Sequence, residues 1–252
     1  MAGAGKRLPC RREDRRREIA LGRIAAMPRC AIIFDLDDTL YPERAYTFSG
    51  FRAVAAAFPG RLCASFALYD RMRELYDTPD RGRVFNVIVE QCGCSDADLL
   101  VSEMVAAFRK HQPDIRLFPD AAAALDRLRG RYKLGLISDG FLEAQQAKVC
   151  ALGLADRLDE IIITDQWGGR KFWKPHPRAF EEMAVRLDVA PSECAYVADN
   201  RAKDFIAPNA LGWRTVLIER RGAVYTDATA PPHGDPGATV ASLDELEAVL
   251  HT

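Results

Sequence analysis

The chain has 252 residues, of which 48% are hydrophobic and 28% are charged, and its formal net charge is −1. This length is enough for one large domain or two modest ones. A net charge so close to zero creates no overall field that would attract nucleic acid. No apolar stretch approaches the roughly 20 residues that a membrane span needs. We therefore expect a globular protein with neither a nucleic-acid partner nor a membrane partner.

The first 29 residues differ in charge from the rest of the chain. They carry nine Lys and Arg residues against three acidic ones, a balance of +6 that leaves −7 for residues 30–252. They lack the apolar core of a secretory signal, and their interleaved acids count against an organellar transit peptide. We expect a basic, disordered extension over residues 1–29. A nucleic-acid-binding tail is one alternative, and a misassigned start codon is another, because Met27 lies just before the first predicted strand.

The cysteines follow no spacing typical of zinc or redox sites. Cys92 and Cys94 are separated by one residue, whereas such sites use C-x-x-C. Cys30 and Cys194 stand at the starts of predicted buried strands, where a free cysteine behaves as a small apolar residue. We interpret the cysteines as reduced and structural, which favours a cytoplasmic location. The chain has seven: Cys10, Cys30, Cys63, Cys92, Cys94, Cys150 and Cys194.

A short apolar run at residues 31–34 is followed at once by three carboxylates. The run is rich in β-branched and aromatic residues, which is typical of a buried strand in a parallel sheet. Asp35, Asp37 and Asp38 at its end would repel one another unless a cation binds there. Carboxylates are the hard oxygen ligands that a divalent cation prefers. The alternative is a strand followed by an acidic, solvated turn.

Residues 44–113 show apolar residues at helical spacing and no convincing strand. A segment of about 70 residues is large enough to bury a small core of its own. We expect it to form a helical domain inserted after the first strand. The predicted helices cover residues 49–58, 61–76, 84–91 and 97–111.

From residue 114 onward, predicted strands alternate with predicted helices. The strands are expected at 132–137, 159–164, 194–198, 213–218 and 239–240. The helices are expected at 120–129, 142–152, 177–187, 203–211 and 243–250. Such alternation implies a parallel sheet with right-handed crossovers. The predicted fold class is therefore α/β, a Rossmann-like parallel sheet flanked by helices (residues 30–43 and 114–252), with an inserted α-helical cap domain (residues 44–113).

Polar residues follow several of these strands. The carboxyl ends of parallel strands share one edge of a sheet, so these side chains should converge there. They supply a carboxylate nucleophile, a proton donor, a metal site and phosphate-binding groups, which are the parts that phosphoryl transfer requires. The set is Asp35, Asp37, Ser138, Asp139, Gly140, Lys174, Asp199 and Asp204.

The order and separation of four motifs resemble those of the haloacid dehalogenase superfamily, in its phosphatase branch. Each motif is weak alone, and the four in this order are specific. The helical insertion resembles the cap of that family's C1 subgroup, and the resemblance covers roughly residues 30 to 250. The motifs are DLDDT at 35–39, SDG at 138–140, KPHP at 174–177 and ADNRAKD at 198–204.

This resemblance implies roles for the first-motif carboxylates. Asp35 matches the nucleophile that attacks phosphorus and forms an aspartyl-phosphate. Asp37 matches the general acid and base, and it can serve as both only if nearby like charges raise its pKa. Asp35, the backbone carbonyl of Asp37, and Asp199 match the ligands of Mg²⁺.

The resemblance also implies a phosphate-binding set. Ser138 and Lys174 match the pair that orients the phosphate, and Gly140 allows a close approach of the backbone. Lys171 is a competing phosphate lysine, but the proline after Lys174 and the family match favour Lys174. The full predicted phosphate-binding set is Asp35, Ser138, Asp139, Gly140 and Lys174. Three further residues are expected to contact the site residues and hold them in place, without binding the substrate: Thr39, Asn200 and Asp204.

The sequence departs from the family's common pattern at two positions. Ala198 stands where glycine usually precedes the fourth-motif aspartate, and it is tolerable if its backbone is not at positive φ. Asp139 stands where asparagine is more common. Its carboxylate would add negative charge beside the phosphate unless the side chain points away.

The expected function is that of a Mg²⁺-dependent phosphatase acting on a small phosphorylated metabolite, as a monomer or homodimer. A phosphomutase of the same architecture and a catalytically silent binding module are the alternatives. A true haloacid dehalogenase, which needs no metal, would leave Asp37 and Asp199 without a use. Four arginines in or beside the cap are candidates to meet an anionic substrate: Arg44, Arg52, Arg81 and Arg83.

Overall fold

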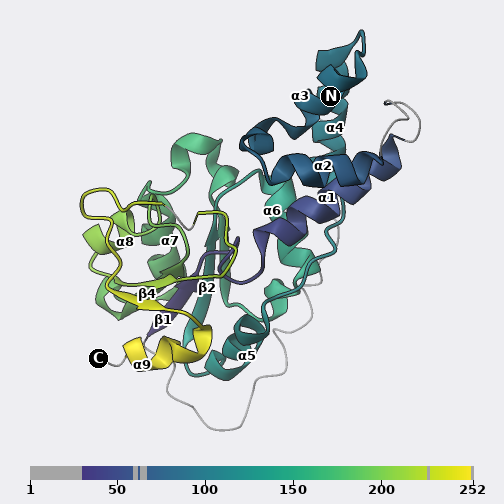
Figure 1. Cartoon of the computed structure of the whole chain (residues 1–252). Helices are drawn as coiled ribbons and strands as arrows, with labels where there is room; N and C mark the ends of the chain where they lie inside the picture. The colour runs from purple at the N-terminus through teal and green to yellow at the C-terminus, as the bar shows by residue number, and fades with distance from the viewer. Residues whose placement is uncertain (1–29, 59–61, 63–66, 226–227, 251–252) are drawn as a thin grey trace, which may run out of the picture.

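The protein is built on a six-stranded parallel sheet with helices on both faces (Figure 1). The computed structural model describes residues 30–58, 62, 67–225 and 228–250. The prediction for residues 1–29 lies outside the described residues. The strands run in the order β3-β2-β1-β4-β5-β6, with every neighbouring pair parallel. They are β1 (Ala31–Phe34), β2 (Lys133–Ser138), β3 (Glu160–Ile163), β4 (Cys194–Ala198), β5 (Arg214–Ile218) and β6 (Ala238–Val240). The predicted α/β fold class is confirmed.

The first strand lies in the middle of the sheet and is buried on both faces. Ile32 and Phe34 contribute to the apolar cluster on one face, whereas Ala31 and Ile33 contribute to the cluster on the other. Successive side chains of a strand point to opposite faces, so a continuous apolar run suits only a strand covered on both sides. This is why the local pattern identified β1 correctly.

Two groups of helices cover the two faces of the sheet. Apolar residues of α5 (Pro119–Leu128), α6 (Leu142–Ala151) and α9 (Leu246–Leu250) lie in the first cluster. Residues of α7 (Arg178–Leu187) and α8 (Ile206–Ala210) lie in the second. Figure 1 shows α7 and α8 on one side of the strands and α5 and α6 on the other. Short 3₁₀ turns occur at Leu154–Asp156, Thr164–Trp167, Arg170–Phe172, Pro191–Glu193 and Leu243–Glu245.

A helical unit projects from the carboxyl-end side of the sheet, and we call its residues 43–113 the helical insertion (Figure 1). It has an apolar cluster of its own, which includes Phe51, Val54, Met72, Ile88 and Met104. This separate cluster lets the insertion pack as a unit rather than as an extension of the sheet's core. Its elements are α1 (Glu43–Ala57), α2 (Leu68–Tyr76), a 3₁₀ turn (Pro79–Arg83), α3 (Val84–Cys92) and α4 (Ala97–Lys110).

The start of α1 differs from the prediction. The apolar pattern placed the first residue of this helix at Ser49, whereas the helix begins at Glu43. Its first turns carry Tyr46, which packs in the core cluster of the sheet and not in that of the insertion. The two ends of α1 therefore bury against different partners, so no single apolar face marks the whole helix.

The cysteines fit the sequence interpretation only in part. Cys194 is buried at the start of β4, as expected, but Cys30 is exposed. Cys30, Cys94, Cys150 and Cys194 are free, whereas Cys92 is disulfide-bonded, so the expectation that every cysteine is reduced is wrong at Cys92.

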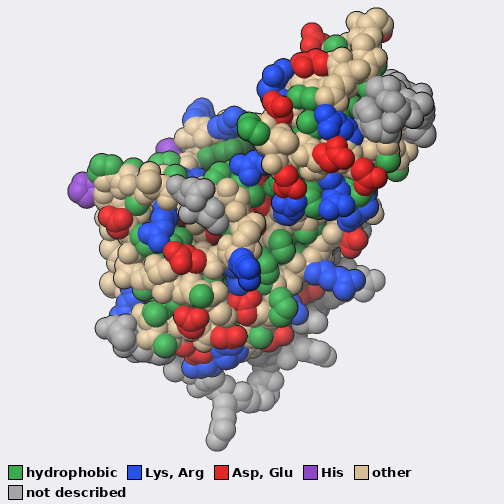
Figure 2. All heavy atoms as spheres, viewed as in Figure 1, with side chains coloured by type: hydrophobic (Ala, Val, Ile, Leu, Met, Phe, Trp, Pro, Cys, Tyr) green, Lys and Arg blue, Asp and Glu red, His purple; other side chains and the backbone are tan. Residues whose placement is uncertain are grey.

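Acidic and basic side chains are intermixed over the visible face of both parts of the molecule (Figure 2). Within the described ranges, no helix combines the length and the apolar character needed to cross a membrane.

Candidate active site

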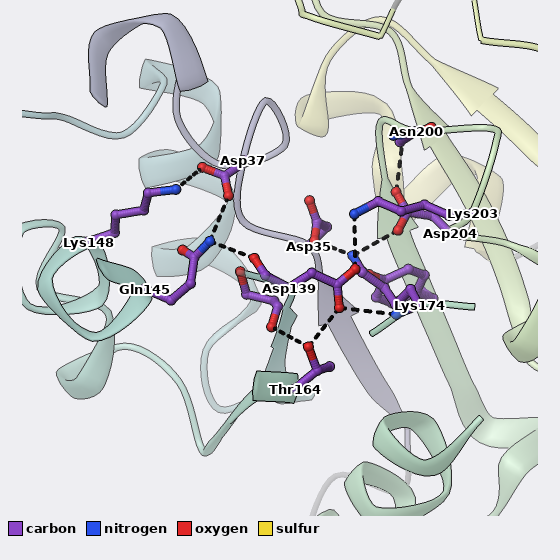
Figure 3. Close-up of polar contacts among 12 residues, drawn as sticks. Asp35, Asp37, Asp139, Gln145, Lys148, Thr164, Lys174, Asn200, Lys203 and Asp204 are labelled. Atoms are coloured by element: carbon purple, nitrogen blue, oxygen red, sulfur yellow. Dashed lines mark hydrogen bonds and ion pairs between the residues drawn. The ribbon is translucent and has the colours of Figure 1, made fainter. Parts of the chain in front are cut away.

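The predicted site residues meet at the carboxyl ends of the central strands (Figure 3). The last residue of β1, Phe34, is paired with Leu136 of β2 and with Val197 of β4. The next residue, Asp35, donates its backbone N–H to the Val197 carbonyl at 2.9 Å. The parallel register thus places the residues that follow β1, β2 and β4 at one edge of the sheet.

Three carboxylates form the acidic centre of this edge. Oxygens of Asp35, Asp199 and Asp204 all lie within 4.8 Å of one another. Burial, followed by the charges of Asp35 and Asp204, raises the pKa of Asp199 to about 9. Burial also raises the pKa of Asp35 to about 7, although Lys174 opposes the shift.

Crowding of this kind is unfavourable without a compensating cation. The donor set fits a divalent metal, because carboxylate oxygens gathered this closely are the ligands that Mg²⁺ takes. The structure adds Asp204 to the side chains that the sequence proposed for the metal. It also turns the Asp37 side chain away from this cluster, so that only its backbone carbonyl could take the predicted role.

The Lys174 side chain is fully buried, and its ammonium contacts three protein oxygens. Its Nζ lies 2.5 Å from Asp35 Oδ1 and 2.8 Å from Asp204 Oδ1, and it donates to Tyr196 Oη at 2.9 Å. Burial alone would lower its pKa, but Asp204 and Asp35 outweigh it and raise that pKa well above its usual value. The ammonium therefore stays charged and holds Asp35 in place. The competing Lys171 is exposed and stacks on Phe172, so Lys174 is the lysine of this site.

The loop after β2 presents a hydroxyl and a glycine to the site. Ser138 Oγ is buried and has no hydrogen-bond partner among the described residues. Gly140 has φ +130°, a conformation that L side chains rarely adopt, and a Cβ there would collide with Gln145. The glycine is thus required by backbone conformation and by close packing. A buried hydroxyl with a free donor can bind a ligand oxygen.

Asp139 turns its carboxylate into the protein. Oδ1 accepts hydrogen bonds from Thr164 Oγ1 at 2.8 Å and from the Lys174 N–H at 3.1 Å, and Oδ2 accepts from Lys203 Nζ at 3.0 Å. Burial raises the pKa of Asp139, but the charges of Lys174 and Lys203 more than offset this and lower it. The extra charge at this position is therefore compensated locally. Ala198 is the other departure from the family pattern. Its φ is not positive, so the condition under which alanine is tolerable at this position is met.

Asp37 lies apart from the acidic centre and is held by three donors. Oδ1 accepts from the Tyr41 hydroxyl and from Lys148 Nζ, the latter at 2.6 Å, and Oδ2 accepts from Gln145 Nε2 at 3.2 Å. Figure 3 shows Lys148 and Gln145 reaching Asp37 from the side opposite Lys174. Burial raises the pKa of Asp37, but Lys148 and the other donors outweigh burial and lower it. The expectation that like charges raise this pKa is wrong.

Lys148 also links Asp37 to the helical insertion. It lies on α6 and is 5% exposed. Its Nζ is 4.2 Å from the ring centroid of Tyr46 on α1. A buried ammonium over an aromatic face is a favourable cation–π contact. One lysine thus contacts both the candidate acid and the first helix of the insertion.

The remaining predicted residues support the loops around the site. Asp38 accepts the backbone N–H groups of Glu43 and Val224, both at 2.8 Å. The Thr39 carbonyl accepts from Arg220 at 2.9 Å. Asn200 donates its N–H to Asp204 Oδ2 at 3.1 Å, which fixes the loop after β4.

Three of the four arginines that the sequence offered for an anionic substrate form ion pairs. Arg44, Arg52 and Arg83 pair with Asp77, Asp114 and Glu90, respectively. For Arg81 the structure shows no ion pair among the described residues, and the Tyr76 ring is its stacking partner. Arg81 and Arg44 help to line a cavity of about 520 Å³ between the insertion and the core loop at residues 222–224.

Sequence reasoning missed four polar side chains of the site: Tyr41, Gln145, Lys148 and Lys203. Gln145 and Lys148 are three residues apart on α6 and both are buried, and such a polar pair on an inward helix face is a usable signal. Lys203 precedes Asp204, and nothing in its local pattern distinguishes it from a surface lysine.

The protein is of the doubly wound α/β class, with an acidic site at the carboxyl edge of its sheet. The sequence matches the haloacid dehalogenase-like hydrolases over residues 31–212, and the chain belongs to this family. A glyceraldehyde 3-phosphate phosphatase from Methanopyrus kandleri is 31% identical over 198 residues, which cover 75% of this chain and 84% of that protein.

Two further relatives extend the comparison. A phosphoserine phosphatase from Thermus thermophilus is 33% identical over 169 residues, which cover 67% of this chain and 64% of that protein. The structure of the HAD-hydrolase YfnB from Bacillus subtilis, bound to magnesium, aligns with a TM-score of 0.66 at 16% identity. That alignment covers 89% of this chain and 100% of the other, and it shows a shared fold.

Proposed function

We propose that the protein is a phosphatase that hydrolyses the phosphate monoester of a small metabolite through an aspartyl-phosphate on Asp35. One observation carries this proposal. A buried carboxylate at the end of the central strand is paired with Lys174, adjoins Asp199 and Asp204, and lies beside the loop of the unpartnered Ser138 hydroxyl. A nucleophile, a cationic anchor and a free phosphate donor are thereby combined in one place.

The chemistry would divide between the first-motif carboxylates. Asp35 attacks phosphorus, and the bond from phosphorus to the leaving oxygen breaks. Asp37 is the candidate donor of a proton to that oxygen and the later acceptor of one from water. Its carboxylate accepts from three donors, two on Oδ1 and one on Oδ2, so one lone-pair site on Oδ2 remains to carry a proton toward the leaving group.

A Mg²⁺ ion is part of the proposal. Asp35, Asp199 and Asp204 are the side chains that would hold it, with the Asp37 carbonyl as the further ligand implied by the family motif. When bound, the ion would supply positive charge against the phosphate oxygens and the three carboxylates. The raised pKa values of Asp35 and Asp199 support this assignment, because a cation would remove the repulsion that contributes to them.

We also propose that the helical insertion is a cap that closes over the substrate. The insertion projects on the side of the sheet where the site lies, and Tyr46 on its first helix contacts Lys148. A closing cap excludes water and suits small molecules rather than phosphoproteins. The glyceraldehyde 3-phosphate and phosphoserine phosphatases among the relatives support a small phosphorylated metabolite as the substrate class.

A cytoplasmic location is the last part of the proposal. The four free described cysteines support it, and the disulfide at Cys92 counts against it. Alkylation of free thiols at the moment of cell lysis, followed by mass analysis of Cys92, tests the point. A Cys92 that is oxidised in intact cells contradicts a reducing compartment.

The test of the activity is a phosphate-release assay over sugar phosphates, nucleotides and small phosphorylated acids, each with Mg²⁺ and with EDTA. We expect turnover of at least one small ester, abolished by EDTA and restored by Mg²⁺. Asp35→Asn should reduce turnover to near background, whereas Asp156→Asn, an exposed carboxylate on a 3₁₀ turn, serves as the matched control and should not.

The other outcomes separate the alternatives. Halide release from a haloacid in EDTA indicates a dehalogenase. An isomerised phosphate ester without free phosphate indicates a mutase. Binding of ligands without any turnover indicates a silent binding module.

A further inference from the structure

Lys203 is a second lysine at this site that the sequence did not identify. Its Nζ has one hydrogen-bond partner among the described residues, Asp139 Oδ2 at 3.0 Å. An ammonium carries three donors, so two remain for another ligand. The side chain is 35% exposed and extends toward the acidic centre (Figure 3). It lies close enough to Asp35 for its charge to lower the pKa of that nucleophile.

Lys174 has no such capacity in this structure. Its ammonium lies against Asp35, Asp204 and Tyr196, all within 2.9 Å. To bind a phosphate oxygen it must first release one of these buried partners. Releasing a buried carboxylate would be costly, so the neutral Tyr196 hydroxyl is the partner that a phosphate oxygen could replace. Lys174 thus has at most one donor for the phosphate, whereas Lys203 has two.

The charged groups nearest to Lys203 favour a further cation. Asp35, Asp199, Asp204 and Asp139 contribute four negative charges if all are ionised, and Lys174 contributes one positive charge. With Lys203 the sum is −2, which one divalent cation neutralises. Without Lys203, an incoming phosphate dianion would meet a site that is still negative after the metal has bound.

We propose that Lys203 is a further binding residue for the transferred phosphate group, beside Ser138 and Lys174, and that Asp139 positions its ammonium. This assignment rests on the proposed phosphatase function, because it assumes that a phosphate enters this edge. The same assignment explains why an aspartate stands where the family usually has asparagine: its carboxylate anchors Lys203, the lysine that binds the substrate.

The competing explanation is that Lys203 only neutralises Asp139. Both explanations predict that Lys203→Met weakens phosphate binding, since that variant leaves Asp139 buried without its cation. They differ for the double variant Asp139→Asn with Lys203→Met, which removes both charges and restores the usual asparagine. If Lys203 only neutralises Asp139, the double variant should bind phosphate as the wild type does.

The experiment measures the dissociation constant of inorganic phosphate by calorimetry on the full chain with Mg²⁺, together with KM and kcat for the substrate found in the screen. We expect Lys203→Met to weaken phosphate binding by about 10- to 100-fold, the effect of one charge-assisted hydrogen bond. The double variant should remain at least about 10-fold weaker than wild type. Asp139→Asn alone should weaken phosphate binding by a few-fold, less than Lys203→Met does, because Lys203 keeps its charge but loses the ion pair that positions it. Lys171→Met, an exposed lysine three residues before Lys174, is the matched control and should be unchanged.

Recovery of wild-type phosphate affinity in the double variant overturns the proposal, as does an unchanged affinity in Lys203→Met. Should Lys203→Met fail to fold around an unpaired Asp139, the double variant still decides the question. A wild-type chain that hydrolyses no phosphate ester overturns both this inference and the proposed function. A wild type that turns over and binds phosphate, with a Lys203→Met variant that does so equally well, overturns the inference alone.

Discussion

Replacing Lys148 by Met tests the electrostatics around Asp37. The Lys148 and Asp37 side chains are 6% and 21% exposed, and Nζ lies 2.6 Å from Oδ1. At an effective dielectric constant of 20, the attraction at this distance is about 6 kcal/mol, which is an upper bound. Removing one partner of a buried pair usually costs about 3–5 kcal/mol, because the other charge is left uncompensated. For a chain of this size, that loss lowers Tm by roughly 6–20 °C.

The pH dependence gives the prediction a second, independent readout. In the wild type the pKa of Asp37 is lowered, so its contribution to the free energy of unfolding is present above the unfolded-state pKa and is lost as pH falls through the folded-state value. In Lys148→Met the cation that opposed burial is gone, so the pKa of Asp37 rises. Its protonation in acid then relieves the penalty. The stability gap between the two proteins should be largest near pH 7 and should narrow as pH approaches 4.

The assay is urea unfolding of both proteins at pH 7 and at pH 4.5 in EDTA, which keeps metal binding out of the comparison. Lys148→Arg, which retains the charge, should recover most of the stability, and Lys171→Met should lose none. A gap below about 1 kcal/mol at pH 7 contradicts a strong buried pair. An equal gap at both pH values shows that the loss comes from packing against Tyr46 rather than from the charge of Asp37.

Three further substitutions test other parts of the structure. Asp120→Asn removes a 2.7 Å ion pair with the buried Arg220. Burial raises the pKa of Asp120, but Arg220, the Leu243 N–H and Ser242 together outweigh burial and lower it. The variant should therefore lose about 1–3 kcal/mol of unfolding free energy at pH 7, and the loss should shrink as pH falls through the folded-state pKa; a loss that does not change with pH would contradict the ion pair. Gly140→Ala places a Cβ against Gln145 at φ +130° and should cost about 1–3 kcal/mol in urea unfolding, so unchanged stability would refute the strained geometry. Arg81→Ala should raise KM several-fold for substrates with a second anionic group and leave 4-nitrophenyl phosphate unaffected; equal effects on both would exclude a role in recognition.

Local sequence patterns were sufficient for the strands. Buried parallel strands need continuous apolar runs, and the predicted strands agree with the observed ones to within one residue at each end. The start of α1 was predicted less well, because Tyr46 packs against the sheet while later residues pack within the insertion. An amphipathic pattern reports one buried face and cannot describe a helix whose two ends face different cores.

The sequence by itself determined which polar residues follow the central strands, and hence that Asp35, Ser138 and Asp199 share one edge of the sheet. Parallel topology makes that convergence unavoidable once the strands are identified. The tertiary structure alone decided where the carboxylates point. Asp37 accepts from Gln145 and Lys148, which are 108 and 111 residues away in the chain, and Asp139 accepts from a lysine 64 residues away. No local pattern encodes such contacts, because side-chain direction and pKa depend on which distant groups the fold brings within hydrogen-bonding distance.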